Sequence, residues 1–112
     1  MSKIKIKIEL IQNNKLIKQE EVEGIKTDNI LKYISYKTIE TFDIKNLKLN
    51  RKTKEYTNVI DFKQQKSKIT YNNFEVELNL KTLNINQKEN EIIIKYEITD
   101  TKDIYEYKII WR

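Results

Sequence analysis

Arg51 is the residue best suited to recognising a charged group, because the other arginine, Arg112, is the last residue of the chain. A guanidinium donates two parallel hydrogen bonds to one carboxylate or phosphate, which a lysine cannot do. If Arg51 follows the inward phase of Leu47 and Leu49, it needs a partner in an apolar interior. That partner is either an internal acid such as Asp61 or the acidic group of a ligand. The alternative is an outward or structurally paired arginine that packs on an aromatic ring.

Aromatic side chains form the second set of candidates. Tyr105, Tyr107 and Trp111 alternate along one face of the last strand-like segment. Tyrosines that line a barrel would combine an apolar wall with hydroxyls that orient a guest. The alternative is simple core filling, because about eight strands enclose a lumen just wide enough for one small ligand or for the barrel's own side chains. The candidate ligand-binding residues are Arg51, Tyr33, Phe62, Tyr71, Tyr96, Tyr105, Tyr107 and Trp111.

Residues for most kinds of catalysis are missing from the composition. The chain has no cysteine and no histidine, which excludes thiol nucleophiles, disulfides, and the commonest general base and metal ligand. The acidic pairs Glu20-Glu21 and Asp100 with Asp103 lie in no context that would raise a pKa, and no glycine-rich loop could hold a phosphate. We therefore expect a protein that is not an enzyme and that uses no metal or cofactor.

The formal net charge of +5 supports an anionic partner only weakly. Lys, Asn and Ile are over-used in the way that an AT-rich coding sequence produces. Basic residues without intervening acids cluster on one face only at Lys3, Lys5 and Lys7, where lysines also protect an edge strand from aggregation. Nucleic-acid binding through lysines and stacked tyrosines is the rival hypothesis.

Charged and apolar residues alternate almost from end to end. Residues 3–10 read KIKIKIEL, and residues 74–81 read FEVELNLK. This period of two places one apolar face inward and one charged face in water, which is typical of antiparallel sheets. The sequence therefore predicts one all-β domain over residues 1–112.

Short polar breaks divide the chain into about eight strands. The simplest topology is an up-and-down meander that closes into a barrel and so removes its sheet edges. Asn13-Asn14 and Asn72-Asn73 are expected turns. The apolar spacing of residues 30–39 also fits a helix, although their β-branched and aromatic content favours a strand. The strand-length segments are 3–12, 15–24, 30–39, 42–51, 55–64, 74–83, 91–99 and 104–111, with 84–90 as a mobile loop.

Three short motifs resemble the YwiB-like proteins. They are Val76-x-Leu78-x-Leu80-x-Thr82, Ile92-x-Ile94-x-Tyr96-x-Ile98, and Leu49-Asn50-Arg51 ahead of Phe62. Members of this family are small bacterial cytoplasmic proteins with a lipocalin-like (calycin) β-barrel and no established function. The resemblance implies a lipocalin-like barrel for most of this chain, with Arg51 and Phe62 at central family positions.

The expected location is the cytoplasm, because the first residues lack the apolar core of a signal peptide and no apolar run reaches the length of a membrane helix. The expected function is non-catalytic binding of a small, partly apolar ligand in the barrel, with Arg51 holding an acidic group. The alternative is a basic interaction module that binds nucleic acid or a protein through its surface.

Overall fold

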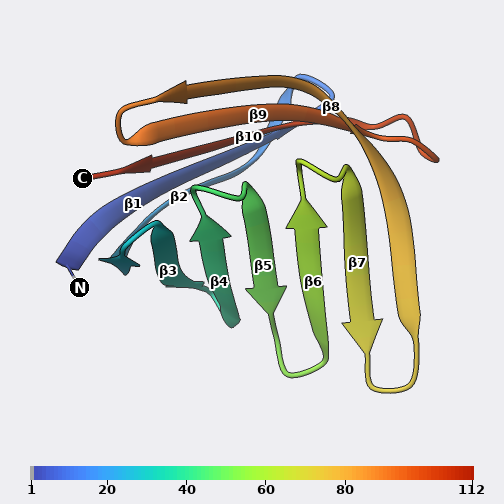
Figure 1. The fold of residues 1–112 in the computed structure, drawn as a ribbon, viewed down its shortest axis with the longest axis horizontal. Helices are drawn as coiled ribbons and strands as arrows, with labels where there is room; N and C mark the ends of the chain where they lie inside the picture. Colours follow the sequence, from blue (N-terminus) through green and yellow to red (C-terminus); the bar gives the residue numbers. More distant parts are fainter. Residues whose placement is uncertain (1) are drawn as a thin grey trace.

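Strand-forming sequence fills nearly the whole chain. Neighbouring strands are all antiparallel, and β1 pairs with both β2 and β10, so that the up-and-down meander closes into a barrel. The predicted fold class is confirmed, with ten strands in place of about eight. No helix in the described residues is long and apolar enough to cross a membrane. The computed structural model describes residues 2–112, which form β1 (Ser2–Gln12), β2 (Lys15–Thr27), β3 (Ile30–Ser35), β4 (Thr38–Asp43), β5 (Lys48–Lys52), β6 (Tyr56–Asp61), β7 (Lys66–Tyr71), β8 (Glu75–Lys88), β9 (Glu91–Ile98) and β10 (Ile104–Trp111) (Figure 1).

Positive φ angles at non-glycine residues set several hairpins. Asn13 and Asn14 have φ angles of 48° and 68° and join β1 to β2, as predicted. Tyr36, with a φ of 56°, turns the predicted strand 30–39 back on itself, so that this segment becomes β3 and the start of β4. The helical alternative for these residues is wrong.

Two other predicted boundaries are also wrong. The expected strand 42–51 is interrupted by a turn in which the Asp43 carboxylate accepts the backbone N–H of Asn46 at 2.9 Å. The expected mobile loop 84–90 is strand up to Lys88, because its backbone pairs in register with β9. The two additional strands have separate origins: residues 30–51 form three strands in place of two, and β7 (Lys66–Tyr71) is not among the expected segments.

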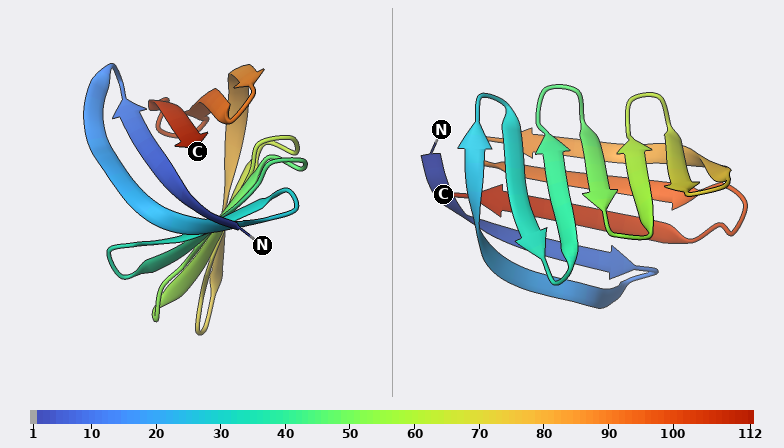
Figure 2. Two further views of the ribbon diagram at one scale, coloured as in Figure 1. Left: turned by 90° about the vertical axis from the view of Figure 1, so that its left-hand side faces the viewer. Right: turned by 90° about the horizontal axis from the view of Figure 1, so that it is seen from below.

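The barrel is flattened into two layers whose strands run across one another (Figure 2). The upper layer contains β9, β10 and β1, and the lower layer contains β3 to β7 (Figure 1). The two longest strands belong to both layers. Strand β8 pairs with β7 over residues 75–79 and with β9 over residues 80–88, while β2 pairs with β1 along most of its length and with β3 only over residues 24–27.

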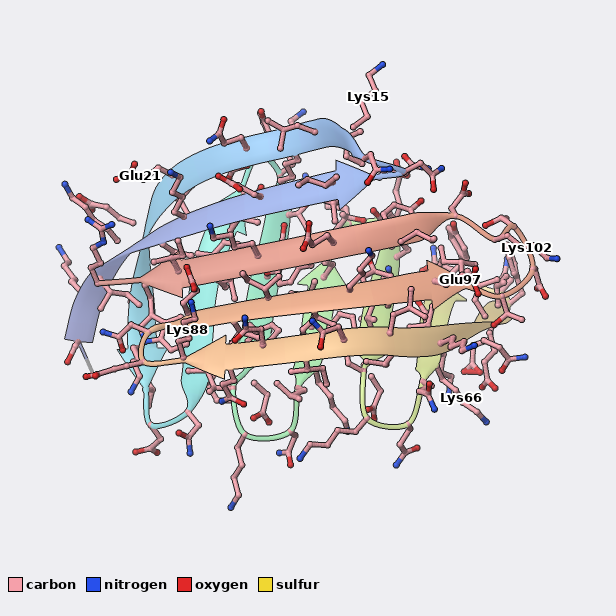
Figure 3. All side chains as sticks on the ribbon, turned by 90° about the horizontal axis from the view of Figure 1, so that it is seen from above. Lys15, Glu21, Lys66, Lys88, Glu97 and Lys102 are labelled. Carbon is pink, nitrogen blue, oxygen red and sulfur yellow. The ribbon has the colours of Figure 1, made fainter. Side chains whose placement is uncertain are left out.

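Bulky side chains fill the space between the layers, because alternate residues of every strand point inward. Lysines and glutamates occupy the outward positions, and Lys15, Lys66 and Lys102 extend away from the barrel in Figure 3. The buried apolar residues are Ile6, Ile8, Leu31, Tyr33, Phe42, Leu47, Leu49, Ile60, Phe62, Leu80, Ile92, Ile94, Tyr96, Tyr107, Ile109 and Trp111.

Gly24 occupies the corner at which β2 passes from the upper to the lower layer. A Cβ atom at this position would lie 2.5 Å from Cδ1 of Ile6 and 2.8 Å from the backbone oxygen of Lys32. The missing side chain therefore lets three strands approach closely at this corner.

We expect Gly24→Ala to lower the free energy of unfolding by about 1–3 kcal/mol, because the added methyl group must displace a core side chain and a strand backbone. Urea denaturation measures this loss. Glu23→Ala, at the exposed neighbouring position, is the control and should change stability by less than about 0.5 kcal/mol. A Gly24→Ala protein as stable as the parent would contradict the close approach of the strands.

Candidate functional site

Four polar residues form a row across the inner face of the lower layer. Register pairs Tyr33 with Glu40, Glu40 with Arg51, and Arg51 with Asn58 on the consecutive strands β3 to β6. The buried Phe42 lies two positions from Glu40 in β4 and therefore shares its inward face. Arg51 accordingly follows the inward phase.

The carboxylate of Glu40 lies at the centre of this row and is only 1% exposed. Its Oε1 accepts a hydrogen bond from the Tyr33 hydroxyl at 2.9 Å and lies 3.6 Å from Nε of Arg51. Its Oε2 accepts a hydrogen bond from Nζ of Lys18 at 3.4 Å. A buried carboxylate requires such partners, since desolvation of an unpaired charge costs several kcal/mol. Asp61, the acid suggested from the sequence, pairs instead with Lys48 at 3.7 Å.

Lys18 and Glu20 reach this row from β2. Nζ of Lys18 lies 3.9 Å from Oε2 of Glu20, which accepts a 2.8 Å hydrogen bond from Oγ of Ser35. We call the set Lys18, Glu20, Ser35, Glu40 and Arg51 the charged cluster. It lies toward the end of the barrel that carries the β1–β2, β3–β4 and β5–β6 hairpins, and it ties β2 to the lower layer.

Two more tyrosines extend the cluster into the core. The hydroxyls of Tyr33 and Tyr107 lie 3.1 Å apart, and the ring of Tyr107 packs on Phe42. Burial raises the pKa of Tyr33, with further increases from Tyr107 and Glu40. Burial also raises the pKa of Tyr107.

The guanidinium of Arg51 does not use all of its hydrogen-bond donors within the described residues. Burial acts to lower its pKa, but Glu40 and the nearby tyrosines more than offset this effect, so that the pKa is raised and the group stays charged. Its Nε is buried and has no hydrogen-bond partner among residues 2–112. The side chain as a whole is 24% exposed. Such a group can accept an anion through its terminal nitrogens.

The structure brings some of the predicted site residues together. Arg51, Tyr33 and Tyr107 lie at or beside the charged cluster. Tyr96 stacks on Tyr105, with ring centroids 5.4 Å apart, and burial raises the pKa of Tyr96 to about 12.

The other predicted residues lie elsewhere. Phe62 is buried against Tyr96, with ring centroids 5.2 Å apart, and Trp111 is buried in the core. Tyr71 lies near the tip of the β7–β8 hairpin. The sequence analysis named Glu20 only within an acidic pair that it set aside, and it did not identify Lys18 or Glu40. Their inward phase within β2 and β4 could have indicated them, since a charged residue at an inward position calls for a partner.

Tyr56, Tyr71 and Phe74 form an aromatic cluster on the two hairpins that extend below the upper layer (Figure 1). Tyr71 stacks on Phe74, with centroids 4.8 Å apart, and lies 5.8 Å from Tyr56. Tyr71 is 37% exposed and Phe74 is 60% exposed. Tyr56 shares the inward phase of Asn58, so the cluster continues the face that carries Arg51.

The surface lysines near this aromatic cluster are paired with acids. Lys66 lies 3.3 Å from Glu77, and Lys68 lies 3.2 Å from Glu75. On the first hairpin, Lys5 and Lys7 similarly face Glu23 and Glu21 in register. This interleaving reduces the positive potential that a phosphate backbone requires. Within the described part of the chain, no cluster of three or more acidic residues could hold a metal ion.

Comparisons with protein-family models, with curated proteins and with solved structures find no match to this chain. The site must therefore be interpreted from its own geometry.

The buried tyrosines predict a loss of stability in alkali. A tyrosine with a raised pKa in the folded protein holds its proton where the unfolded chain has lost it, so stability is complete below about pH 10 and falls as the pH rises above it. The slope is about 1.4 kcal/mol per pH unit for each such tyrosine.

Absorbance at 295 nm and circular dichroism, followed together between pH 9 and 13, measure this effect. We expect Tyr33, Tyr96 and Tyr107 to ionise only as the fold is lost. Tyr107→Phe should reduce this phase of the absorbance change. Ionisation of all the tyrosines in one step near pH 10, with the fold intact, would contradict their burial.

Proposed function

We propose that this protein binds a small molecule that carries an acidic group and a flat apolar body, without catalysing a reaction. The observation that carries the proposal is the charged guanidinium of Arg51, which makes an ion pair with Glu40 while its buried Nε has no hydrogen-bond partner among residues 2–112. In this proposal the acidic group binds Arg51 at the hairpin end of the barrel.

The contacts of Arg51 support binding through its terminal nitrogens. Its Nε lies 3.6 Å from Oε1 of Glu40 and makes no hydrogen bond there. The two terminal nitrogens are then left for a carboxylate or phosphate, the geometry in which arginine is most selective. Lys18 adds a second positive charge on the other side of Glu40.

Packing supports a ligand at the barrel end and not deep within it. Phe42 and Tyr107 are fully buried below the charged cluster, and their rings are in contact. The exposed rings of Tyr71 and Phe74 offer an apolar surface on the same face as Arg51. The ligand would therefore place its apolar body on these rings, in a lipocalin-like manner but nearer to solvent.

Arg51→Met is expected to weaken binding of an aromatic acid by ten-fold or more, because the methionine keeps the apolar stem and removes the charge. The probe is 8-anilinonaphthalene-1-sulfonate, which is fluorescent, aromatic and anionic, titrated at fixed ionic strength. Arg51→Lys should recover only part of the affinity, since it restores the charge but not the planar fork.

Arg112→Met is the matched control, because it removes the only other arginine, and it should bind as the parent does. Circular dichroism must show that each variant is folded. Equal affinity for the parent and a folded Arg51→Met protein would reject Arg51 as the anchor. Equal loss in both arginine variants would indicate a non-specific charge effect.

Glu40→Gln separates the structural role of the charged cluster from its binding role. Loss of the carboxylate leaves Lys18 and Arg51 without their shared partner and should lower the free energy of unfolding by about 3 kcal/mol. The same change releases Arg51 from its internal competitor, so the probe anion should bind more tightly. Urea denaturation and the fluorescence titration measure the two effects. A parallel loss of stability and affinity would contradict binding at Arg51.

The alternative is nucleic-acid binding, which the net charge of +5 and the exposed Tyr71–Phe74 stack favour. The pairing of neighbouring lysines with Glu75 and Glu77 speaks against it. Binding to single-stranded oligonucleotides that falls steeply with added salt would support this alternative.

A further inference from the structure

The second half of β8 leaves one edge of the upper layer uncovered. Beyond Asn79, β8 has left β7 and pairs only with β9. The β6–β7 turn covers the start of this edge through Gln65. The backbone N–H of Leu80 donates a 2.9 Å hydrogen bond to the backbone oxygen of Gln65, and the backbone N–H of Thr82 donates a 2.9 Å hydrogen bond to the side-chain oxygen of Gln65. The cover ends at Thr82, so the free edge is the segment 83–88.

The free edge begins at a bulge, because the register between β8 and β9 shifts between Thr82 and Asn84. Beyond this bulge it lacks the other features that usually prevent strand pairing. Residues 83–87 read LNINQ and carry no charge, and Leu83 and Ile85 are both exposed. Natural edge strands are normally protected by lysines, prolines, bulges or inward charges. The corresponding part of β2 shows such protection, because Lys18 and Glu20 point inward from it. The segment 84–87, beyond the bulge, is therefore an unprotected edge in a chain that is otherwise rich in charge.

We propose that the free edge of β8 pairs antiparallel with the same edge of a second copy of this chain. A two-fold axis through Ile85 would place Ile85 opposite Ile85 of the second copy and Asn84 opposite Asn86, with the bulge at Leu83 outside the paired residues. Each apolar or amide side chain thus meets an uncharged one, and no like charges face each other across these positions. Both copies use the same residues in this pairing, as a two-fold interface requires.

A second copy fits this edge better than an unrelated strand does. The segment has no charge by which a different partner could be selected, whereas self-pairing puts the exposed isoleucine against its own equivalent. The upper layer would then continue through β9, β8 and the second copy's β8 and β9 as one sheet. Because a single pair of short strands buries little surface, the dimer should be weak and should depend on protein concentration.

Cysteine cross-linking tests both the dimer and its register. The parent has no cysteine, so Ile85→Cys introduces one thiol per chain at the proposed two-fold axis. Mild oxidation should convert most of this variant into a disulfide-linked dimer. Ile39→Cys is the matched control, since Ile39 is 42% exposed against 38% for Ile85, but β4 is paired on both sides. Equal cross-linking of the two variants, or none in Ile85→Cys, would overturn the proposal.

Sedimentation equilibrium of the parent between micromolar and millimolar concentration measures the dimer without any cross-link. Ile85→Lys should raise the dissociation constant by ten-fold or more, because two lysines would face each other across the axis. Ile39→Lys should leave it unchanged. A parent that stays monomeric at every concentration would reject the dimer. An Ile85→Lys protein that dimerises as the parent does would reject this edge as the interface. Neither result bears on anion binding at Arg51, which uses other strands.

Discussion

The buried carboxylate of Glu40 is the constraint on which the interior of this barrel depends. A charge with 1% exposure is stable only when cations and hydrogen-bond donors surround it. The barrel supplies them from β2, β3 and β5 as Lys18, Tyr33 and Arg51. These partners come from the lower layer and from the part of β2 that pairs with β1, so the same carboxylate links that part of β2 to the lower layer. Arg51 is thereby held beside Glu40, although its Nε makes no hydrogen bond.

Bulky apolar side chains fill the rest of the interior. The chain has one glycine and no proline, and isoleucine, leucine and aromatic rings fill the space between the layers. Gly24 is used where β2 changes layer, at a corner that would not tolerate a Cβ atom. Dense packing places the deep lumen out of reach of a ligand and leaves recognition to the barrel end, where the charged and aromatic clusters share one face.

The fold could be predicted from the sequence because the alternation of charged and apolar residues persists through most strands. Strand boundaries are harder to predict from the sequence, because turns such as the one at Tyr36 use a positive φ angle at a residue that is neither glycine nor proline. The segment 84–88 was expected to be a loop because both of its faces are exposed, which removes the burial that creates an alternating pattern. The inward position of Arg51 could be anticipated from Leu49, but Glu40 and Lys18 could not be assigned to it. Their meeting depends on the barrel register between strands that are distant in sequence.

The two proposed binding surfaces lie at different ends of β8 and need not interfere. The first half of β8 belongs to the lower layer and borders the hairpin that carries Tyr71 and Phe74. The second half borders β9 and ends at the opposite end of the barrel, so that self-pairing there leaves the face around Arg51 uncovered. Ligand binding at Arg51 would contact side chains of the lower layer, whereas dimer formation would extend the backbone pairing of the upper layer. Coupling between sites requires a shared element with two arrangements, and the pairing of β8, with β7 before its bend and with β9 after it, shows only one. Each copy in a dimer should therefore bind its ligand independently.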